Sequence, residues 1–219
     1  MFPNWNYIMI ISIAHQKGGV GKSTIVFNLA HYLAEFNPVL IDLDLQNTIS
    51  FANKIRSSAA DPFNIQIINT DNELKKIIQQ SNDSNLFIID TGGFDSSLNR
   101  MSIIASDLII TPVSDKLFEI LGLKKFESIL MELSKIKKEK VKTHILLNNI
   151  SPFTKKLGDL NEFIQKSEYF ILLNSVLRQR ADIVHSSSKG LSVAEHNKHS
   201  KAHYEILELA NEIKKILHK

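Results

Sequence analysis

The sequence predicts an α/β fold, with a mostly parallel, twisted sheet of about seven or eight strands and helices on both faces. Short apolar runs alternate along the chain with segments of helical periodicity. Several runs are apolar at every position, which is typical of strands buried on both faces. With 219 residues and 43% hydrophobic content, the chain can bury one sizeable core, so we expect a single domain over 1–219.

The elements of the first half follow from apolar runs and helix signals. Residues 1–7 show no periodicity and are expected to form a loose extension. The apolar runs predict strands at 8–14, 39–44, 65–68 and 86–90. Between them, apolar stripes and a Thr70 or Asp71 N-cap predict helices at 23–35, at 45–57 and from the N-cap to 78.

The second half continues the alternation. A short helix near 96–105 precedes a strand at 108–111, which Pro112 closes. The apolar runs predict two further strands, at 143–147 and 169–176. Helical periodicity predicts a long helix at 114–138, a helix at 154–166 and an amphipathic helix at about 200–217.

A glycine-rich loop between the first strand and the first helix predicts a phosphate-binding site. The residues expected to bind the nucleotide are Gly18, Gly19, Val20, Gly21, Lys22, Ser23 and Thr24. Glycines let backbone N–H groups turn toward phosphate oxygens, and the following helix adds the positive end of its dipole. We expect Lys22 on the β- and γ-phosphates and the Ser23 hydroxyl on Mg²⁺.

Three aspartates at strand ends complete the predicted site. Asp90 is placed to hold Mg²⁺ through water, and Asp44 is the candidate for orienting the water that attacks the γ-phosphate. Asp42 would support the Mg²⁺ shell or Lys22, and a purely structural role is the alternative. Each aspartate taken alone could also be a helix cap or a turn former.

Lys17 is a second lysine in the loop, beside Gln16, which stands where the pattern G-x-x-x-x-G-K-[ST] has glycine. Lys22 already serves one nucleotide, so Lys17 either points away or reaches a phosphate in another subunit. In the second case it would stabilise charge on the γ-phosphate in trans, and ATP would join two subunits into a dimer.

The motifs resemble those of one family. The stretch 17–24 matches the deviant Walker A motif of the ParA/MinD group of P-loop ATPases, 42–46 resembles its D-x-D-P-Q element, and 86–93 resembles its Walker B and second switch. The segments 105–112 and 189–195 are also similar to segments of this group. The resemblance covers nearly the whole chain from Ile8, and the length suggests the small plasmid-type (Soj- or ParF-like) members.

The resemblance implies a function. Such proteins hydrolyse ATP slowly, and they dimerise with two ATP molecules and Mg²⁺ at the interface, where Lys17 would serve the other subunit's nucleotide. The ATP-bound homodimer binds double-stranded DNA without sequence preference, and a ParB-like partner stimulates hydrolysis during plasmid or chromosome partition. The expected location is the cytoplasm, on the nucleoid when ATP is bound.

The resemblance also implies an adenine site at two later strand ends. Asn148 falls where relatives often place an asparagine on the adenine, and Leu177 and Arg178 would flank the base on its other side. A turn asparagine is the alternative interpretation of Asn148. Three residues depart from the family pattern: His15 replaces asparagine, and Leu45 and Arg178 replace prolines. None of the three removes a catalytic group.

Basic residues are unevenly distributed. From 178 to 219, eight Lys or Arg residues face five Asp or Glu residues. Non-specific DNA binding requires only cations that reach phosphates. The candidates for DNA contact are Arg180, Lys198, Lys201, Lys214 and Lys215. A solvated helix face is the alternative for such segments and is favoured for the lysines at 124–142.

Composition narrows the choice of function. The chain has no cysteine, which excludes disulfides and thiolate metal sites and disfavours metal-inserting relatives. A MinD-like spatial regulator would need an amphipathic anchor beyond the last core helix, and the chain ends two residues after Leu217, so no stable membrane binding is expected. A ParA-like ATPase that positions another cellular cargo remains open as an alternative.

Overall fold

Seven strands form one sheet in the order β3-β2-β4-β1-β5-β6-β7, and every neighbouring pair is parallel. The structure is a computed structural model that describes residues 9–80, 86–116, 119–154 and 157–218, so the loose extension expected at 1–7 lies outside the described residues. The strands are β1 Met9–Ile13, β2 Val39–Asp42, β3 Asn64–Ile67, β4 Leu86–Asp90, β5 Leu108–Val113, β6 Thr143–Ile150 and β7 Phe170–Arg178.

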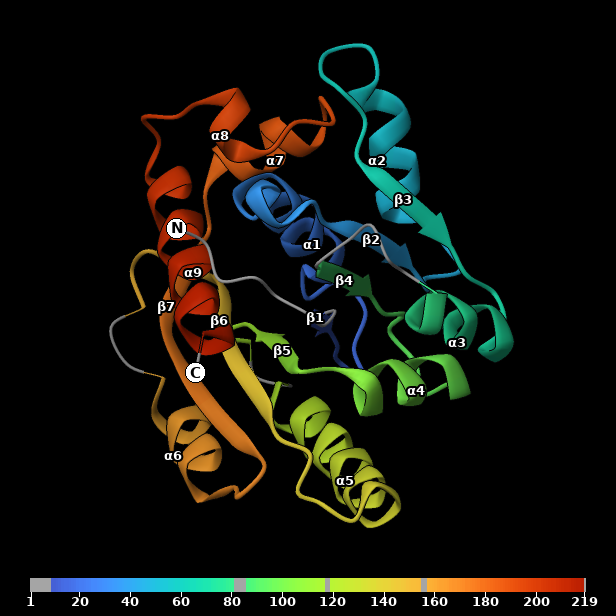
Figure 1. Cartoon of the computed structure of the whole chain (residues 1–219). Helices are drawn as coiled ribbons and strands as arrows, with labels where there is room; N and C mark the ends of the chain where they lie inside the picture. The colour runs from blue at the N-terminus through green and yellow to red at the C-terminus, as the bar shows by residue number, and fades with distance from the viewer. Residues whose placement is uncertain (1–8, 81–85, 117–118, 155–156, 219) are drawn as a thin grey trace.

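Helices cover both faces of this sheet (Figure 1), as the sequence predicts. Helices α1 and α9 pack on one face, and α3, α4, α5 and α6 pack on the other. The helices are α1 Lys22–Tyr32, α2 Thr48–Arg56, α3 Asp71–Gln80, α4 Ser97–Ala105, α5 Glu119–Lys137, α6 Gly158–Lys166, α7 Ala181–Ser187, α8 Val193–His196 and α9 Lys201–Leu217, with a 3₁₀ turn η1 at Ala34–Phe36. Among the described residues, no helix is long and apolar enough to cross a membrane.

The continuous apolar runs are explained by burial on two sides. In β4, Leu86 and Ile88 pack in the core under α1 and α9, whereas Phe87 and Ile89 pack in the opposite core. All residues of β1, β2, β4 and β5 are buried, whereas the edge strand β3 is partly exposed. The alternation places Asp90, which shares the face of Leu86 and Ile88, on the same side of the sheet as α1.

Some boundaries differ from those that the sequence predicts. The strand expected at 39–44 ends at Asp42, and the helix expected from 45 begins at Thr48. Between them the Asn47 N–H donates to the Asp44 carbonyl at 2.8 Å, so a turn interrupts the elements. The helix expected from 114 begins at Glu119. Asp44 therefore lies in a loop, beyond the end of the strand.

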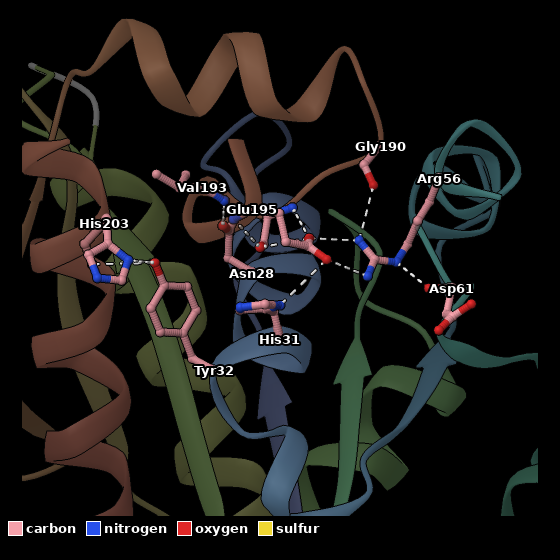
Figure 2. Close-up of polar contacts among 10 residues, drawn as sticks. Asn28, His31, Tyr32, Arg56, Asp61, Gly190, Val193, Glu195 and His203 are labelled. Atoms are coloured by element: carbon pink, nitrogen blue, oxygen red, sulfur yellow. Dashed lines mark hydrogen bonds and ion pairs between the residues drawn. The ribbon is translucent and has the colours of Figure 1, made fainter. Parts of the chain in front are cut away.

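A polar cluster ties α2 to the C-terminal segment (Figure 2). Arg56, at the end of α2, donates from Nη1 and Nη2 to the two carboxylate oxygens of Glu195, both at 2.7 Å. Its guanidinium also lies 4.0 Å from the centre of the Phe63 ring. Gly190 lies so close to α2 that a Cβ on it would be 2.4 Å from the backbone nitrogen of Arg56. This cluster holds α8 and the loop before it against the end of α2.

Candidate nucleotide-binding site

The candidate site lies at the carboxyl edge of the sheet, where three central strands end together. In the strand register, Asp42 of β2 pairs with Asp90 of β4, and Asp90 pairs with Ile13 of β1. The glycine loop leaves β1 at this edge and leads directly into α1. The parallel arrangement thus brings the loop and the predicted carboxylates together, as expected for a ligand site of an open α/β sheet.

Glycines allow the loop its conformation at two positions. Gly19 and Gly21 have φ angles of +73° and +91°, which residues with a side chain rarely adopt. A Cβ on Gly21 would also lie 2.5 Å from Nδ2 of Asn148. That amide donates to the Val20 carbonyl at 2.7 Å, so Asn148 supports the loop from β6.

Lys22 lies inside the loop. It begins α1, is 6% exposed, and its Nζ donates to the Lys17 carbonyl at 3.1 Å. Burial lowers the pKa of Lys22, and the negative charges of Asp90 and Asp44 act in the opposite direction. A cation held inside the loop is suited to contact a bound phosphate.

Asp90 is a buried carboxyl group whose two oxygens lack a hydrogen-bond partner among the described residues. Burial raises its pKa to about 7, the neighbouring Asp42 charge adds to this rise, and the Ser23 hydroxyl counteracts it without reaching hydrogen-bond geometry. An unsatisfied buried carboxylate close to a hydroxyl fits Mg²⁺, which is bound by few protein oxygens and otherwise by water and phosphate.

Asp42 and Asp44 have different surroundings. Both oxygens of Asp42 accept hydrogen bonds: Oδ2 from the Ser50 hydroxyl in the first turn of α2 at 2.7 Å, and Oδ1 from the Asp44 N–H in the loop at 3.2 Å. Burial raises the pKa of Asp42, and the bonds from Ser50 and Asp44 act against this. Asp44 is half-buried in the loop and accepts from the Gln46 N–H. Asp44 is therefore the more available of the two for water.

A pocket of about 170 Å³ continues the site beyond the phosphate loop. Gly19, Val20 and Gly21 form one end of its lining. The three residues expected around the adenine, Asn148, Leu177 and Arg178, also line it, and so does Arg180. The ends of β6 and β7 thus meet the phosphate loop around one space. Its lining also includes the apolar side chains of Ile25, Leu29, Ile183, Ile206 and Leu209.

The Lys17 side chain contacts a different element from Lys22, because it reaches the start of α5. Its Nζ lies 2.8 Å from Oε1 of Glu119, with the Lys17 side chain 33% exposed and that of Glu119 1% exposed. The backbone N–H of Lys17 donates to Nδ1 of His15 at 3.0 Å. His15 is buried and stacked against Phe126, and burial lowers its pKa to about 4, so the ring is neutral at pH 7.

The residues expected to contact DNA do not form one continuous group. Lys198, Lys201 and Lys215 are exposed. Lys214 is paired with Glu35 at 2.9 Å, and Arg180 is paired with Glu205. The five candidates are thus two paired cations and three exposed lysines that form no ion pair with the described residues.

Sequence reasoning missed Glu119, which contacts the loop through Lys17. It included Gly93 in the segment 86–93 but did not predict its contact: a Cβ on Gly93 would lie 2.9 Å from the backbone nitrogen of Gly18, so the segment after β4 packs directly on the loop. The Gly92-Gly93 pair was a visible signal for such a close approach. No local pattern marked Glu119, because its contacts to Lys17 span 102 positions.

The fold and the loop define the class of the protein, which is a P-loop ATPase. A family model described as an AAA domain matches residues 8–92. The virulence plasmid ParA family protein pGP5-D of Chlamydia trachomatis is 28% identical over an alignment of 252 positions that covers 92% of this chain and 92% of that protein.

Solved structures share the fold. Apo McdA from Cyanothece superimposes with a TM-score of 0.76 and 16% identity, covering 96% of this chain and 100% of that one. The septum site-determining protein MinD of Pyrococcus horikoshii, complexed with Mg-ADP, has a TM-score of 0.68 and 18% identity and covers 96% of this chain and 97% of that one. The comparisons confirm the resemblance to the ParA/MinD group of ATPases.

Proposed function

We propose that this chain is a ParA-type partition ATPase. It binds ATP and Mg²⁺, forms a homodimer with the nucleotides between the subunits, and in that state binds double-stranded DNA without sequence preference. A ParB-like partner stimulates slow hydrolysis of ATP to ADP and phosphate, after which the dimer leaves DNA. The protein works in the cytoplasm on the nucleoid, as a single domain. The similarity to a plasmid-encoded ParA family protein supports partition as the process.

The observation that carries the proposal is the different placement of two lysines in one loop. Lys22 is buried inside the loop, whereas the Lys17 side chain leaves it toward Glu119 and is a third exposed. One lysine thus suffices for the subunit's own nucleotide. Lys17, which pairs with Glu119 in its own subunit, serves a second subunit once that pair opens, and there it stabilises charge on the γ-phosphate.

The remaining groups have distinct roles in this proposal. Ser23 and Asp90 hold Mg²⁺, directly or through water, and the ion neutralises charge on the phosphates. Asp42 keeps the start of α2 in place through Ser50. Asp44 orients the attacking water, because it is the accessible carboxylate beside Lys22. Asn148, Leu177 and Arg178 enclose the adenine.

Exposed apolar side chains beside the site support an interface there. Leu45 directly follows Asp44 and is 75% exposed, and Phe94 directly follows Gly93 and is 44% exposed. Large apolar side chains that flank a functional loop on its open side are typical of surfaces that a partner covers. A second subunit placed against this side would bury both residues.

The buried stripe of α9 argues against the MinD-like alternative. Ala202, Ile206, Leu209, Ala210 and Ile213 pack in the core under β7 and α1, so this helix has no apolar stripe left for a membrane surface. A ParA-like ATPase that positions a protein assembly on DNA would use the same chemistry. It differs from partition in its cargo alone.

DNA binding with no nucleotide, with ADP and with ATP tests the proposal. We expect ATP-dependent dimerisation by analytical ultracentrifugation, and DNA binding that requires ATP and weakens steeply between about 50 and 200 mM salt. Lys17→Ala should retain nucleotide binding but lose both dimerisation and DNA binding. Salt-insensitive binding without nucleotide would contradict the proposal. Sedimentation with anionic vesicles checks the MinD-like alternative.

A further inference from the structure

Glu119 is a buried carboxylate whose charge is compensated by Lys17. It is 1% exposed at the start of α5, and its Oε1 accepts from Lys17 Nζ at 2.8 Å and from the Ser114 hydroxyl at 2.7 Å. Its Oε2 has no hydrogen-bond partner among the described residues and faces His15 Nε2 at 3.9 Å. Lys17 is therefore the one cation within salt-bridge distance of this carboxylate in the described part of the chain, since the neighbouring imidazole is neutral.

The surroundings fix Glu119 more firmly than Lys17. The carboxylate is held by Ser114 and lies beside the His15 ring, which in turn packs against Phe126 and against Gly122, where a Cβ would lie 2.8 Å from the ring. Lys17 has a long side chain with a third of its surface in solvent. The lysine is thus the partner that can leave, and Glu119 keeps the Ser114 hydrogen bond when it does.

We infer that Glu119 is a positioning residue that holds Lys17 within its own subunit, and that this ion pair must open before Lys17 can reach a nucleotide bound by the other subunit. The inference rests on the proposed ATP-dependent dimer. One ammonium group cannot stay at 2.8 Å from a buried carboxylate in cis and also contact a phosphate in trans. ATP therefore has to compete with Glu119 for the same cation.

Symmetry doubles the effect on assembly. In a two-fold dimer each subunit gives one Lys17 to the other, so dimer formation breaks two of these ion pairs. Breaking a charge-assisted hydrogen bond to a buried carboxylate costs free energy, because water does not replace the lost partner around the buried Glu119. Glu119 thus keeps the nucleotide-free chain monomeric and raises the ATP concentration at which dimers appear.

The test compares wild type with Glu119→Gln. Glutamine has the same shape and can still accept from Ser114, but it removes the charge that holds Lys17. We expect amine labelling of Lys17, followed by mass spectrometry of the nucleotide-free protein, to become faster in this variant. We also expect dimerisation with ATP to shift to a protein concentration lower by about tenfold or more for each pair that no longer has to break.

Two matched variants serve as controls. Ser114→Ala keeps the Glu119 charge and removes its other hydrogen bond, so Lys17 labelling should not rise. Glu127→Gln removes the same charge from α5 at a residue that contacts Ser167 instead, and it should change neither measurement. Thermal melting shows whether each variant is folded, and Glu119→Asp, which shortens the side chain and withdraws the carboxylate, provides a second way to weaken the pair.

The outcomes separate this inference from the proposed function. If wild type dimerises with ATP and Glu119→Gln does so equally or less readily, the inference is wrong and the proposed function stands. If neither protein dimerises with ATP, the proposed function fails and this inference fails with it. Unchanged labelling of Lys17 in both Glu119 variants would also overturn the inference, whatever the oligomeric state.

Discussion

The three aspartates at the carboxyl edge of the sheet differ in burial and in hydrogen bonding, and these differences suit them to different roles. Asp42 is used by backbone and hydroxyl donors, Asp90 is buried with unsatisfied oxygens, and Asp44 is half-buried in a turn. The first fits a structural role, the second a metal site and the third contact with water. Residue type alone could not distinguish these roles, because all three are aspartates at or just beyond strand ends.

Asp44→Ala should separate ATP binding from hydrolysis. The variant keeps the loop, Lys22 and Asp90, so ATP and Mg²⁺ should still bind and the dimer should still form. Hydrolysis should fall by about a hundredfold or more, because the water loses its orienting group. Phosphate release under single-turnover conditions measures the loss. Hydrolysis at the wild-type rate would exclude Asp44 from the mechanism.

The sequence predicted the residues of the phosphate loop well because their chemistry is local. Gly18 to Thr24 lie together in the chain, between a strand and a helix that are both visible as patterns. Glu119 could not be predicted in this way. Its contact with Lys17 depends on β5 lying beside β1 in the sheet, which brings the start of α5 to the loop.

At the scale of elements, the order of the strands was less predictable than their existence. The apolar runs predicted all seven strands to within a few residues, because burial on both faces leaves a continuous apolar pattern. The helices α7 and α8 were not predicted individually. They are short and are held by tertiary contacts, such as the Asn28 side chain that accepts from the Val193 N–H.

The ion pair between Arg56 of α2 and Glu195 of α8 should make the stability of the fold depend on pH in the acid range. Burial raises the pKa of Glu195, but hydrogen bonds from Arg56 and Ser192 outweigh this and lower it to about 2, below its ordinary value of 4.5. A lowered pKa means that the ionised carboxylate stabilises the fold above about pH 4.5 and that this contribution disappears as the pH falls through about 2.

Arg56→Leu therefore should lower the free energy of unfolding at pH 7 by about 2 kcal/mol, because the Glu195 carboxylate, whose side chain is 21% exposed, loses its charged hydrogen-bond partner. The difference from wild type should shrink as the pH falls from 4.5 toward 2. Urea unfolding at several pH values measures it. Arg100→Leu, which removes a more exposed pair with Asp95 and Glu132, is the control and should cost about 1 kcal/mol or less.

At the scale of the whole molecule, the exposed lysines occupy two places, one at or just before the start of α9 and one near its end. Lys201 begins this helix, and Lys215 lies 14 residues later, about 20 Å away at 1.5 Å per residue. Lys198 and Lys201 are neighbours near its start. A DNA surface on this side would therefore consist of two basic positions in each subunit, and a dimer would present them twice.

Replacing Lys198 and Lys201 together by alanine should weaken DNA binding of the ATP-bound dimer. We expect the slope of log affinity against log salt to decrease by about 0.9 for each phosphate contact that is lost. Filter binding over a salt series measures this. Lys214→Ala should have a smaller effect because Lys214 is paired with Glu35, and Lys124→Ala on α5 should have none. If all these variants weakened DNA binding equally, binding would depend on the overall charge of the protein and not on contacts from Lys198 and Lys201.

The close approach of Gly93 to Gly18 has a consequence for how the two segments move. No side chain lies between these two backbones, and even a Cβ would come within 2.9 Å. Side chains can absorb a small shift by changing rotamer, but two backbones in contact cannot. A shift of the segment after β4 would therefore reach Gly18, the residue next to Lys17, through direct contact between the two backbones.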